Sequence, residues 1–147
     1  MRTSSPRPEA RATRRRLRGV WLLRRIEYRG ADGDSVDPFY RPNSTGVLIY
    51  ASSGWMSVAI AGPGSYYTYA GTWDVDAAGS TVIHRVTTAL LPDEVGVAYR
   101  QRVHFENGQM IFTNRDGPPG ARSVRRKIWV RVPRVPRAPR GARRAAR

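Results

Sequence analysis

Apolar and polar residues alternate along most of the chain between residues 19 and 132, which is the pattern of strands with one buried face. The alternating stretches are rich in Val, Ile, Thr, Tyr and Trp, and short links containing Gly, Asn, Asp or Pro separate them. Two of these links, DAAG and ENG, are short enough for tight hairpins. The pattern predicts eight strands, at about residues 19–29, 46–51, 55–61, 66–76, 80–91, 97–106, 109–115 and 123–132.

The order of these strands predicts an all-β fold, a single antiparallel up-and-down barrel of about eight strands. Sequential hairpins would leave the first and last strands as open edges, and closing the sheet removes both edges. A barrel of this size can hold one small ligand, so we expect a central cavity. After residue 19 no stretch has the apolar period of a helix, and only RRRLRG, at residues 14–19, is compatible with a helical turn.

The net charge of +15 is concentrated at the two ends of the 147-residue chain. Residues 1–18 and residues 133–147 each carry +6, which leaves only +3 for the region between them. Both ends consist largely of Arg, Pro, Ala and Gly and have few apolar side chains to bury. We therefore expect disordered basic tails over residues 1–16 and 133–147, around a domain of residues 17–132.

The tails have two interpretations. They could bind nucleic acid or acidic partners weakly through charge, or they could reflect a general preference for arginine over lysine. No aromatic residue lies among the arginines of either tail to stack on bases, so the sequence does not favour a nucleic-acid partner.

Membrane and secretion signals are missing from the sequence. No apolar run approaches the roughly 20 residues of a membrane-spanning helix. The arginine-rich start of the chain has no apolar stretch of the kind that a secretory signal needs. We therefore expect a cytoplasmic protein without membrane contact.

Strand parity places His84, one of two histidines, inside the predicted barrel. On residues 80–91 the face that contains His84 is the more apolar one and excludes Arg85, so it should point inward. For residues 19–29 parity alone leaves the inner face open. Four of the other predicted strands, 80–91, 66–76, 97–106 and 123–132, each have one face that is more apolar than the other, and this face should point inward. In that order, the inward residues are Val82, His84, Val86, Thr88 and Leu90; Tyr67, Tyr69, Gly71, Trp73 and Val75; Val97, Tyr99, Gln101, Val103 and Phe105; and Val124, Arg126, Ile128, Val130 and Val132.

The order of short motifs along residues 17–132 resembles the bacterial and fungal lipocalin-like domain family. A G-x-W strand is followed by LIY, G-x-M-S and Tyr-x-Gly segments, then by the strand with His84, a strand–Gly–strand hairpin and a final WVR strand. The resemblance implies a small calycin-type barrel with a central cavity. It also implies structural roles for Gly19 and Trp21, with Trp21 plugging the closed end and an arginine of the last strand packed across it. Motif order assigns that arginine to Arg131, whereas strand parity favours Arg126.

If Trp21 points inward, parity also places Arg25 and Glu27 on the inner face of the first strand. They would then have to pair, because an unpaired buried charge is costly, and Glu27 near the open end would be a candidate functional carboxylate. Alternatively, both residues belong to a solvated strand end.

The candidate site is the inner face around His84. A mostly apolar wall with a few hydrogen-bonding groups is typical of small-molecule pockets. His84 has three interpretations: a core residue fixed by a tyrosine hydroxyl, a ligand-recognition group, or an acid/base, since histidine transfers protons near neutral pH. The predicted ligand-binding residues are Tyr67, Tyr69, Trp73, His84, Tyr99 and Gln101.

Several other chemistries have no support in the sequence. His104 is predicted to face outward, and no second inward ligand completes a metal site, so we expect neither a metal nor another cofactor. No serine lies in a nucleophile motif, and no glycine-rich phosphate loop is present.

Two functions remain, and the sequence does not choose between them. The first is binding of a small apolar or aromatic molecule, such as an intermediate of secondary metabolism, in the central cavity. The second is a cofactor-independent cyclase or isomerase that acts on such a molecule with His84 as its acid or base.

Overall fold

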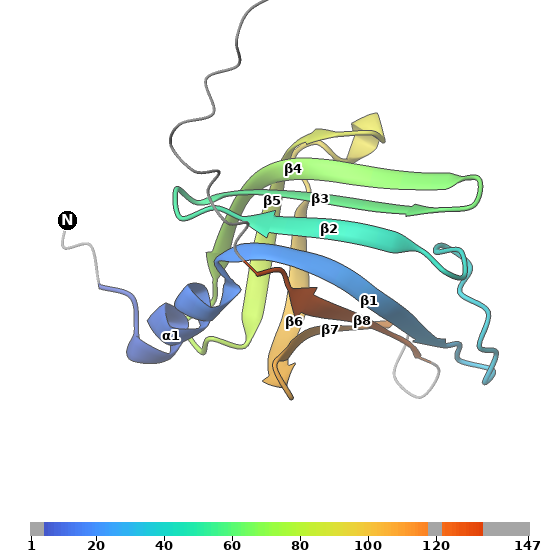
Figure 1. The fold of residues 1–147 in the computed structure, drawn as a ribbon, viewed down its shortest axis with the longest axis horizontal. Coiled ribbons are helices and arrows are strands. Elements are labelled where there is room, and N and C mark those ends of the chain that lie inside the picture. Colours follow the sequence, from blue (N-terminus) through green and yellow to red (C-terminus); the bar gives the residue numbers. More distant parts are fainter. Residues whose placement is uncertain (1–4, 118–121, 134–147) are drawn as a thin grey trace, which may run out of the picture.

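The computed structural model describes residues 5–117 and 122–133, and its main feature is a closed barrel of eight antiparallel strands (Figure 1). Each strand pairs with its neighbours along the chain, and β1 pairs with β8, so the sheet has no open edge. The predicted fold class is confirmed. The elements are α1 (Pro8–Leu17), β1 (Gly19–Arg29), β2 (Thr45–Tyr50), β3 (Trp55–Gly62), β4 (Ser65–Val75), β5 (Thr81–Ala89), the 3₁₀ turn η1 (Pro92–Glu94), β6 (Ala98–Glu106), β7 (Gln109–Asp116) and β8 (Ser123–Arg131).

Tight turns join the strands where the sequence predicts them. Between β6 and β7, Asn107 and Gly108 both have positive φ angles, of 50° and 73°, as a type I′ turn requires. Between β4 and β5, the Asp76 carboxylate accepts hydrogen bonds from the backbone amides of Ser80 and Thr81. Within the described residues, η1 is the only helical segment after residue 19.

A β-bulge in β1 exchanges the inner and outer positions of that strand beyond Leu23. The register with β8 shifts between Leu23 and Arg25, so Ile26 packs against the core. Arg25 and Glu27 therefore lie outside, where the Glu27 carboxylate binds Arg25 at 2.9 Å and Arg126 at 3.1 Å. Of the two alternatives for Arg25 and Glu27, the structure therefore shows the solvated one and not the inward one, because one extra residue changes the parity of all that follow.

A second bulge adds one residue to β5 after Val86. Beyond it Ala89 packs against the core, whereas Thr88 and Leu90, both predicted to point inward, are exposed. Gly71 lies opposite the bulge, and a Cβ atom there would stand 1.9 Å from a backbone carbonyl oxygen of β5. Only glycine fits this position without a backbone shift.

The inner face of β8 is also the opposite of the predicted one. Trp129 is buried in the core and Lys127 lines the interior, whereas Arg126 lies on the outer surface. Ile128 points outward but is buried, opposite Ile111 of β7. Because Ile128 is part of this small outer apolar cluster, the outer face of β8 is as apolar in sequence as a core face, and alternation alone selects it as the inner one.

One end of the barrel is covered by α1 (Figure 1). Leu17 is completely buried in the core, and Ala10 is also buried. The Arg14 guanidinium lies 4.5 Å from the centre of the Trp73 ring and forms an ion pair with Asp74 at 2.8 Å. The helix therefore covers the closed end of the barrel through apolar and cation–π contacts.

This helix contradicts part of the predicted N-terminal tail. The prediction that residues 1–16 are disordered is wrong from Pro8 onward, where the chain forms α1. The helix is held there because two of its apolar side chains are buried against the barrel. The other tail predictions concern residues 1–4 and 134–147, which lie outside the described residues.

Candidate functional site

His84 lies in the barrel interior between two tyrosines. Its Nε2 atom is 2.6 Å from the Tyr50 hydroxyl oxygen, and its Nδ1 atom is 2.6 Å from the Tyr69 hydroxyl oxygen. The His84 side chain is only 2% exposed. Burial and, to a lesser extent, the charge of Lys127 lower the pKa of His84 to about 3, so the ring is neutral at pH 7. This geometry corresponds to a core histidine fixed by tyrosine hydroxyls.

The hydrogen-bond network assigns the proton of the His84 ring. Tyr50 is fully buried, and within the described residues its hydroxyl has His84 as its one partner. If Nε2 carried the proton, the Tyr50 hydroxyl hydrogen would have no acceptor, at a cost of about 1–3 kcal/mol. We therefore assign Nε2 as the acceptor from Tyr50 and Nδ1–H as the donor to Tyr69. The Tyr69 hydroxyl hydrogen then remains available to another acceptor.

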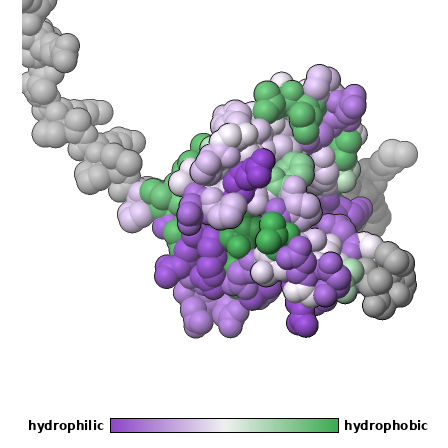
Figure 2. Space-filling view, turned by 90° about the vertical axis from the view of Figure 1, so that its right-hand side faces the viewer, coloured by the Kyte–Doolittle hydropathy of each residue, from purple (hydrophilic) through white to green (hydrophobic). Residues whose placement is uncertain are grey.

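A cavity of about 260 Å³ lies at the end of the barrel opposite α1, among residues of the β1–β2 segment, β4, η1, β6, β7 and β8. Figure 2 looks onto this end and shows apolar patches set among strongly hydrophilic side chains. The interior beneath it is packed, and a void of only about 10 Å³ remains beside His84. Within the barrel, the space for a ligand therefore lies at the open end rather than at the centre. Its aromatic lining residues are Phe39, Tyr40, Tyr67, Tyr69 and Tyr99.

Two amide oxygens in the lining of this cavity have no hydrogen-bond partner among the described residues. They are Oε1 of Gln101 and Oδ1 of Asn114, and the Gln101 side chain is 94% buried. A buried acceptor without a partner costs about 1–3 kcal/mol. Both oxygens lie just below the cavity surface, and rotation of either amide group would present its oxygen to a ligand that donates a hydrogen bond, which would remove this cost.

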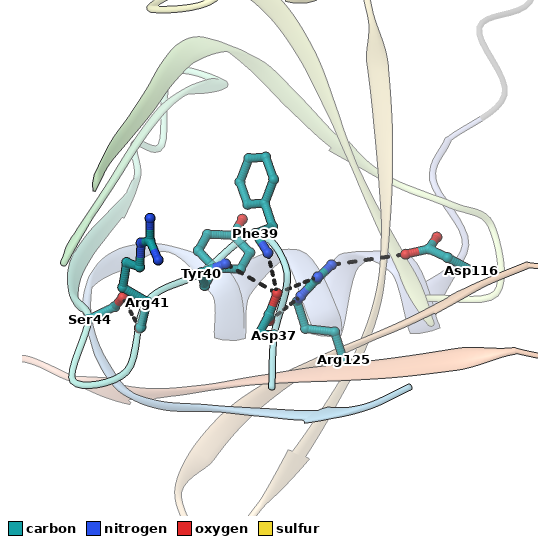
Figure 3. Close-up of polar contacts among 7 residues, drawn as sticks. All are labelled: Asp37, Phe39, Tyr40, Arg41, Ser44, Asp116 and Arg125. Carbon is teal, nitrogen blue, oxygen red and sulfur yellow. Dashed lines mark hydrogen bonds and ion pairs between the residues drawn. The ribbon is translucent and has the colours of Figure 1, made fainter. Parts of the chain in front are cut away.

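The segment between β1 and β2, residues 30–44, is fastened to β8 beside the cavity. The Arg125 guanidinium donates two hydrogen bonds to the Asp37 carboxylate, at 2.7 and 2.8 Å, and the same carboxylate accepts the backbone amides of Phe39 and Tyr40 (Figure 3). Burial by itself would raise the pKa of Asp37, but these donors outweigh it and hold the pKa below its usual value. The segment thereby places two aromatic rings in the cavity wall.

A hydrogen-bonded carboxylate lies on another side of the cavity. The Tyr67 hydroxyl donates to Oε2 of Glu94 at 2.6 Å. Burial and hydrogen bonding to Glu94 raise the pKa of Tyr67 and of Tyr99, so both phenols stay protonated at neutral pH. The cavity wall therefore offers phenol hydroxyls held in fixed positions.

Lys127, the single lysine in the sequence, lines both the cavity and the inner void from β8. Its Nζ atom is 5.1 Å from the centre of the Tyr40 ring. Within the described residues no carboxylate oxygen lies within 4 Å of it; the nearby Asp37 carboxylate pairs with Arg125 instead. Burial, followed by the charge of Arg125, lowers the pKa of Lys127 to about 8.

The structure brings most, but not all, of the predicted ligand-binding residues together. His84 lies beneath the cavity. Trp73 lies near α1, where its indole N–H donates a hydrogen bond to the Ala51 carbonyl oxygen at 3.0 Å, and it has no place in the cavity wall. The four that line the cavity are Tyr67, Tyr69, Tyr99 and Gln101.

The three residues expected to be structural meet at the closed end. The Arg131 guanidinium lies 4.3 Å from the Trp21 ring centre and donates to backbone carbonyls at the end of α1. The Trp21 indole donates to the Leu17 carbonyl oxygen at 2.8 Å. A Cβ atom on Gly19 would stand 2.7 Å from the Arg131 side chain. The alternative, Arg126, lies on the outer surface with Glu27.

Several residues of this region are not among the predicted site residues, and Tyr50, Lys127 and Asp37 show why. Tyr50 follows Leu48 in the alternation of β2, and that parity would have placed it inside. Lys127 had a signal of another kind, because it is the one lysine among 26 basic residues. Asp37 had none, since its partner Arg125 is 88 residues away in the chain.

Comparison with protein-family models finds no match for the chain, and comparison with curated proteins finds none either. Within the described part of the chain, no helix is long and apolar enough to cross a membrane, and no three His, Asp or Glu side chains cluster as metal ligands would. The geometry of the cavity therefore carries the functional argument.

Proposed function

We propose that this protein is a lipocalin-like barrel that binds a small, flat aromatic molecule in the cavity at its open end. The observation that carries the proposal is a cavity of about 260 Å³ with aromatic walls and two amide side chains whose oxygens find no hydrogen-bond partner in the described part of the chain. The arrangement of Trp21 and Arg131 at the closed end agrees with the roles implied by the lipocalin-like resemblance.

The size of the cavity limits the ligand. Pockets for drug-sized molecules measure about 300–1,000 Å³, so this cavity suits a molecule of one or two rings. The inner void adds too little space for another ring. A larger polycyclic ligand would require residues 30–44 to move, together with the ion pair that fastens them.

The polar groups of the wall select a ligand with a hydroxyl or amino group. Tyrosine and phenylalanine rings provide edge and face contacts for an aromatic ring. Rotation of the Gln101 or Asn114 amide would present an acceptor to the ligand, and Tyr69 presents a hydroxyl hydrogen once His84 donates to its oxygen. A phenol meets both requirements, because its hydroxyl donates one hydrogen bond and accepts another.

The alternative, an enzyme with His84 as acid or base, has less support. Both ring nitrogens of His84 are engaged by tyrosine hydroxyls, and Tyr69 lies between the ring and the cavity. A pKa of about 3 also makes the ring a poor base at neutral pH. We therefore propose binding rather than His84-dependent turnover.

The test is a fluorescence titration with 2-naphthol, a two-ring phenol. We expect saturable binding to the wild-type protein that weakens about tenfold or more in Gln101→Leu, since the ligand hydroxyl loses its acceptor. Gln109→Leu is the matched control, because Gln109 lies in the β6–β7 hairpin outside the cavity wall and should not affect binding. Absence of saturable binding, or equal affinity for wild type and Gln101→Leu, would contradict the proposal.

A further inference from the structure

We propose that Lys127 is a nucleophilic amine that captures the carbonyl group of an aromatic aldehyde or ketone in this cavity as an imine. The inference rests on the proposed function, because it assigns a covalent role within the same cavity. It narrows the ligand class to carbonyl compounds. The placement of the single lysine of the chain is the observation behind it.

Lys127 is placed where its side chain can contact a ligand in the cavity. Its side chain comes from an inward position of β8, between Arg125 and Trp129, and contributes to both the cavity and the void below it. In the strand register it lies opposite Ile26 on one side and Phe112 on the other, so apolar residues flank its base. The other 25 basic residues are all arginines, whose guanidinium groups do not act as amine nucleophiles.

The electrostatic setting favours the neutral amine. Burial is the main cause, and Arg125 on the same face adds a positive charge. With a pKa of about 8, about a quarter of the Lys127 side chains are neutral at pH 7.5, against roughly 0.1% for an ordinary lysine. A lysine that is desolvated beside another cation is a typical imine-forming nucleophile.

The groups that face Lys127 come from several elements and define its pH response. Arg125 lies on its own strand, and Tyr40 and Asp37 come from residues 30–44, with Asp37 bound to Arg125. The remaining titratable groups that line the same cavity or void are Tyr67, Tyr69, His84, Glu94, Tyr99 and Asp116.

The reaction is balanced without an oxidant or reductant. The neutral amine nitrogen attacks the carbonyl carbon, and a proton passes from nitrogen to the carbonyl oxygen to give a carbinolamine. The C–O bond then breaks, water leaves with that oxygen, and a C=N bond remains. A wall hydroxyl such as that of Tyr69 can relay this proton by taking one up as it gives one away; burial raises the pKa of Tyr69, so no phenolate forms.

The test is reductive trapping of the whole chain with benzaldehyde and cyanoborohydride at pH 7.5. The hydride reduces any imine to a stable secondary amine, which intact-mass measurement detects as one benzyl group and peptide mapping locates. We expect the adduct at Lys127, formed at a rate that rises with pH around the pKa of about 8. Mapping separates it from reaction at the α-amino group of the chain.

A swapped variant provides the matched control. The double variant Lys127→Arg/Arg126→Lys keeps the charge of the strand but moves its lysine to the neighbouring outer position, which pairs with Glu27 in the native chain. We expect trapping at this outer lysine to be about tenfold slower or more, because an exposed lysine is almost fully protonated at pH 7.5. Equal rates at the two positions, or no adduct at Lys127, would overturn the inference.

Binding of 2-naphthol to the same wild-type preparation separates this inference from the proposed function. If naphthol binds and no Lys127 adduct forms, only the imine inference is wrong. If naphthol does not bind but the adduct forms faster than in the swapped variant, the reactive lysine stands and the phenol-binding proposal is wrong.

Discussion

Protonation of His84 should destabilise the barrel, and the size of the effect follows from its burial. In the folded protein the pKa of His84 is about 3, whereas an unfolded chain has a histidine pKa of about 6.5. Between these two values the unfolded state binds a proton that the folded state does not. The free energy of unfolding therefore falls as the pH falls from 6.5 toward 3, and the full stability is present above 6.5.

The expected magnitude is large enough to measure. One proton bound only by the unfolded state gives a slope of about 1.4 kcal/mol per pH unit, or about 2 kcal/mol between pH 7.5 and pH 5. The assay is urea unfolding of wild type and His84→Gln at both pH values. Glutamine still offers a donor and an acceptor to Tyr50 and Tyr69 but does not titrate. Carboxylates contribute to both proteins, so the difference between them isolates His84.

We expect the stability gap between wild type and His84→Gln to shrink by about 2 kcal/mol on going from pH 7.5 to pH 5. The matched control is His104→Gln, because the His104 side chain is 50% exposed on the outside of β6. This variant should keep the pH dependence of the wild type. A stability gap for His84→Gln that is the same at both pH values would refute the reasoning.

Three further predictions concern the parts that hold the barrel closed. Asp37→Asn should lower the free energy of unfolding in urea by about 1–3 kcal/mol and speed amide hydrogen exchange over residues 30–44, and unchanged exchange would contradict the attachment of that segment. Arg131→Met should lower the free energy of unfolding, measured by thermal unfolding, by about 1–2 kcal/mol, clearly more than Arg126→Met on the outer surface. Equal losses would argue against a stabilising contact between Arg131 and Trp21. Removal of residues 1–14 should lower the Tm by several degrees because it uncovers the closed end, and an unchanged Tm would show that α1 adds no stability.

The amino-acid sequence by itself determined the strands, their order and the closed barrel. The eight predicted strands differ from the observed ones by at most two residues at any end. This success has a local cause, because the alternation of period two and the turn residues are both properties of a few adjacent positions. The inward position of His84 followed from the same alternation, since its strand is regular from Thr81 to Val86.

Only the tertiary structure decided which residues share the cavity. One inserted residue reverses the parity of everything after it, so the bulge in β1 turned Arg25 and Glu27 outward. On β8 the apolar residues outside the barrel made the outer face resemble a core face, so alternation placed Lys127 outside although it points inward. The pairing of Asp37 with Arg125, 88 residues apart, exists only once the sheet has closed. Such contacts depend on the three-dimensional register of strands distant in the chain, and no short stretch of sequence contains that information.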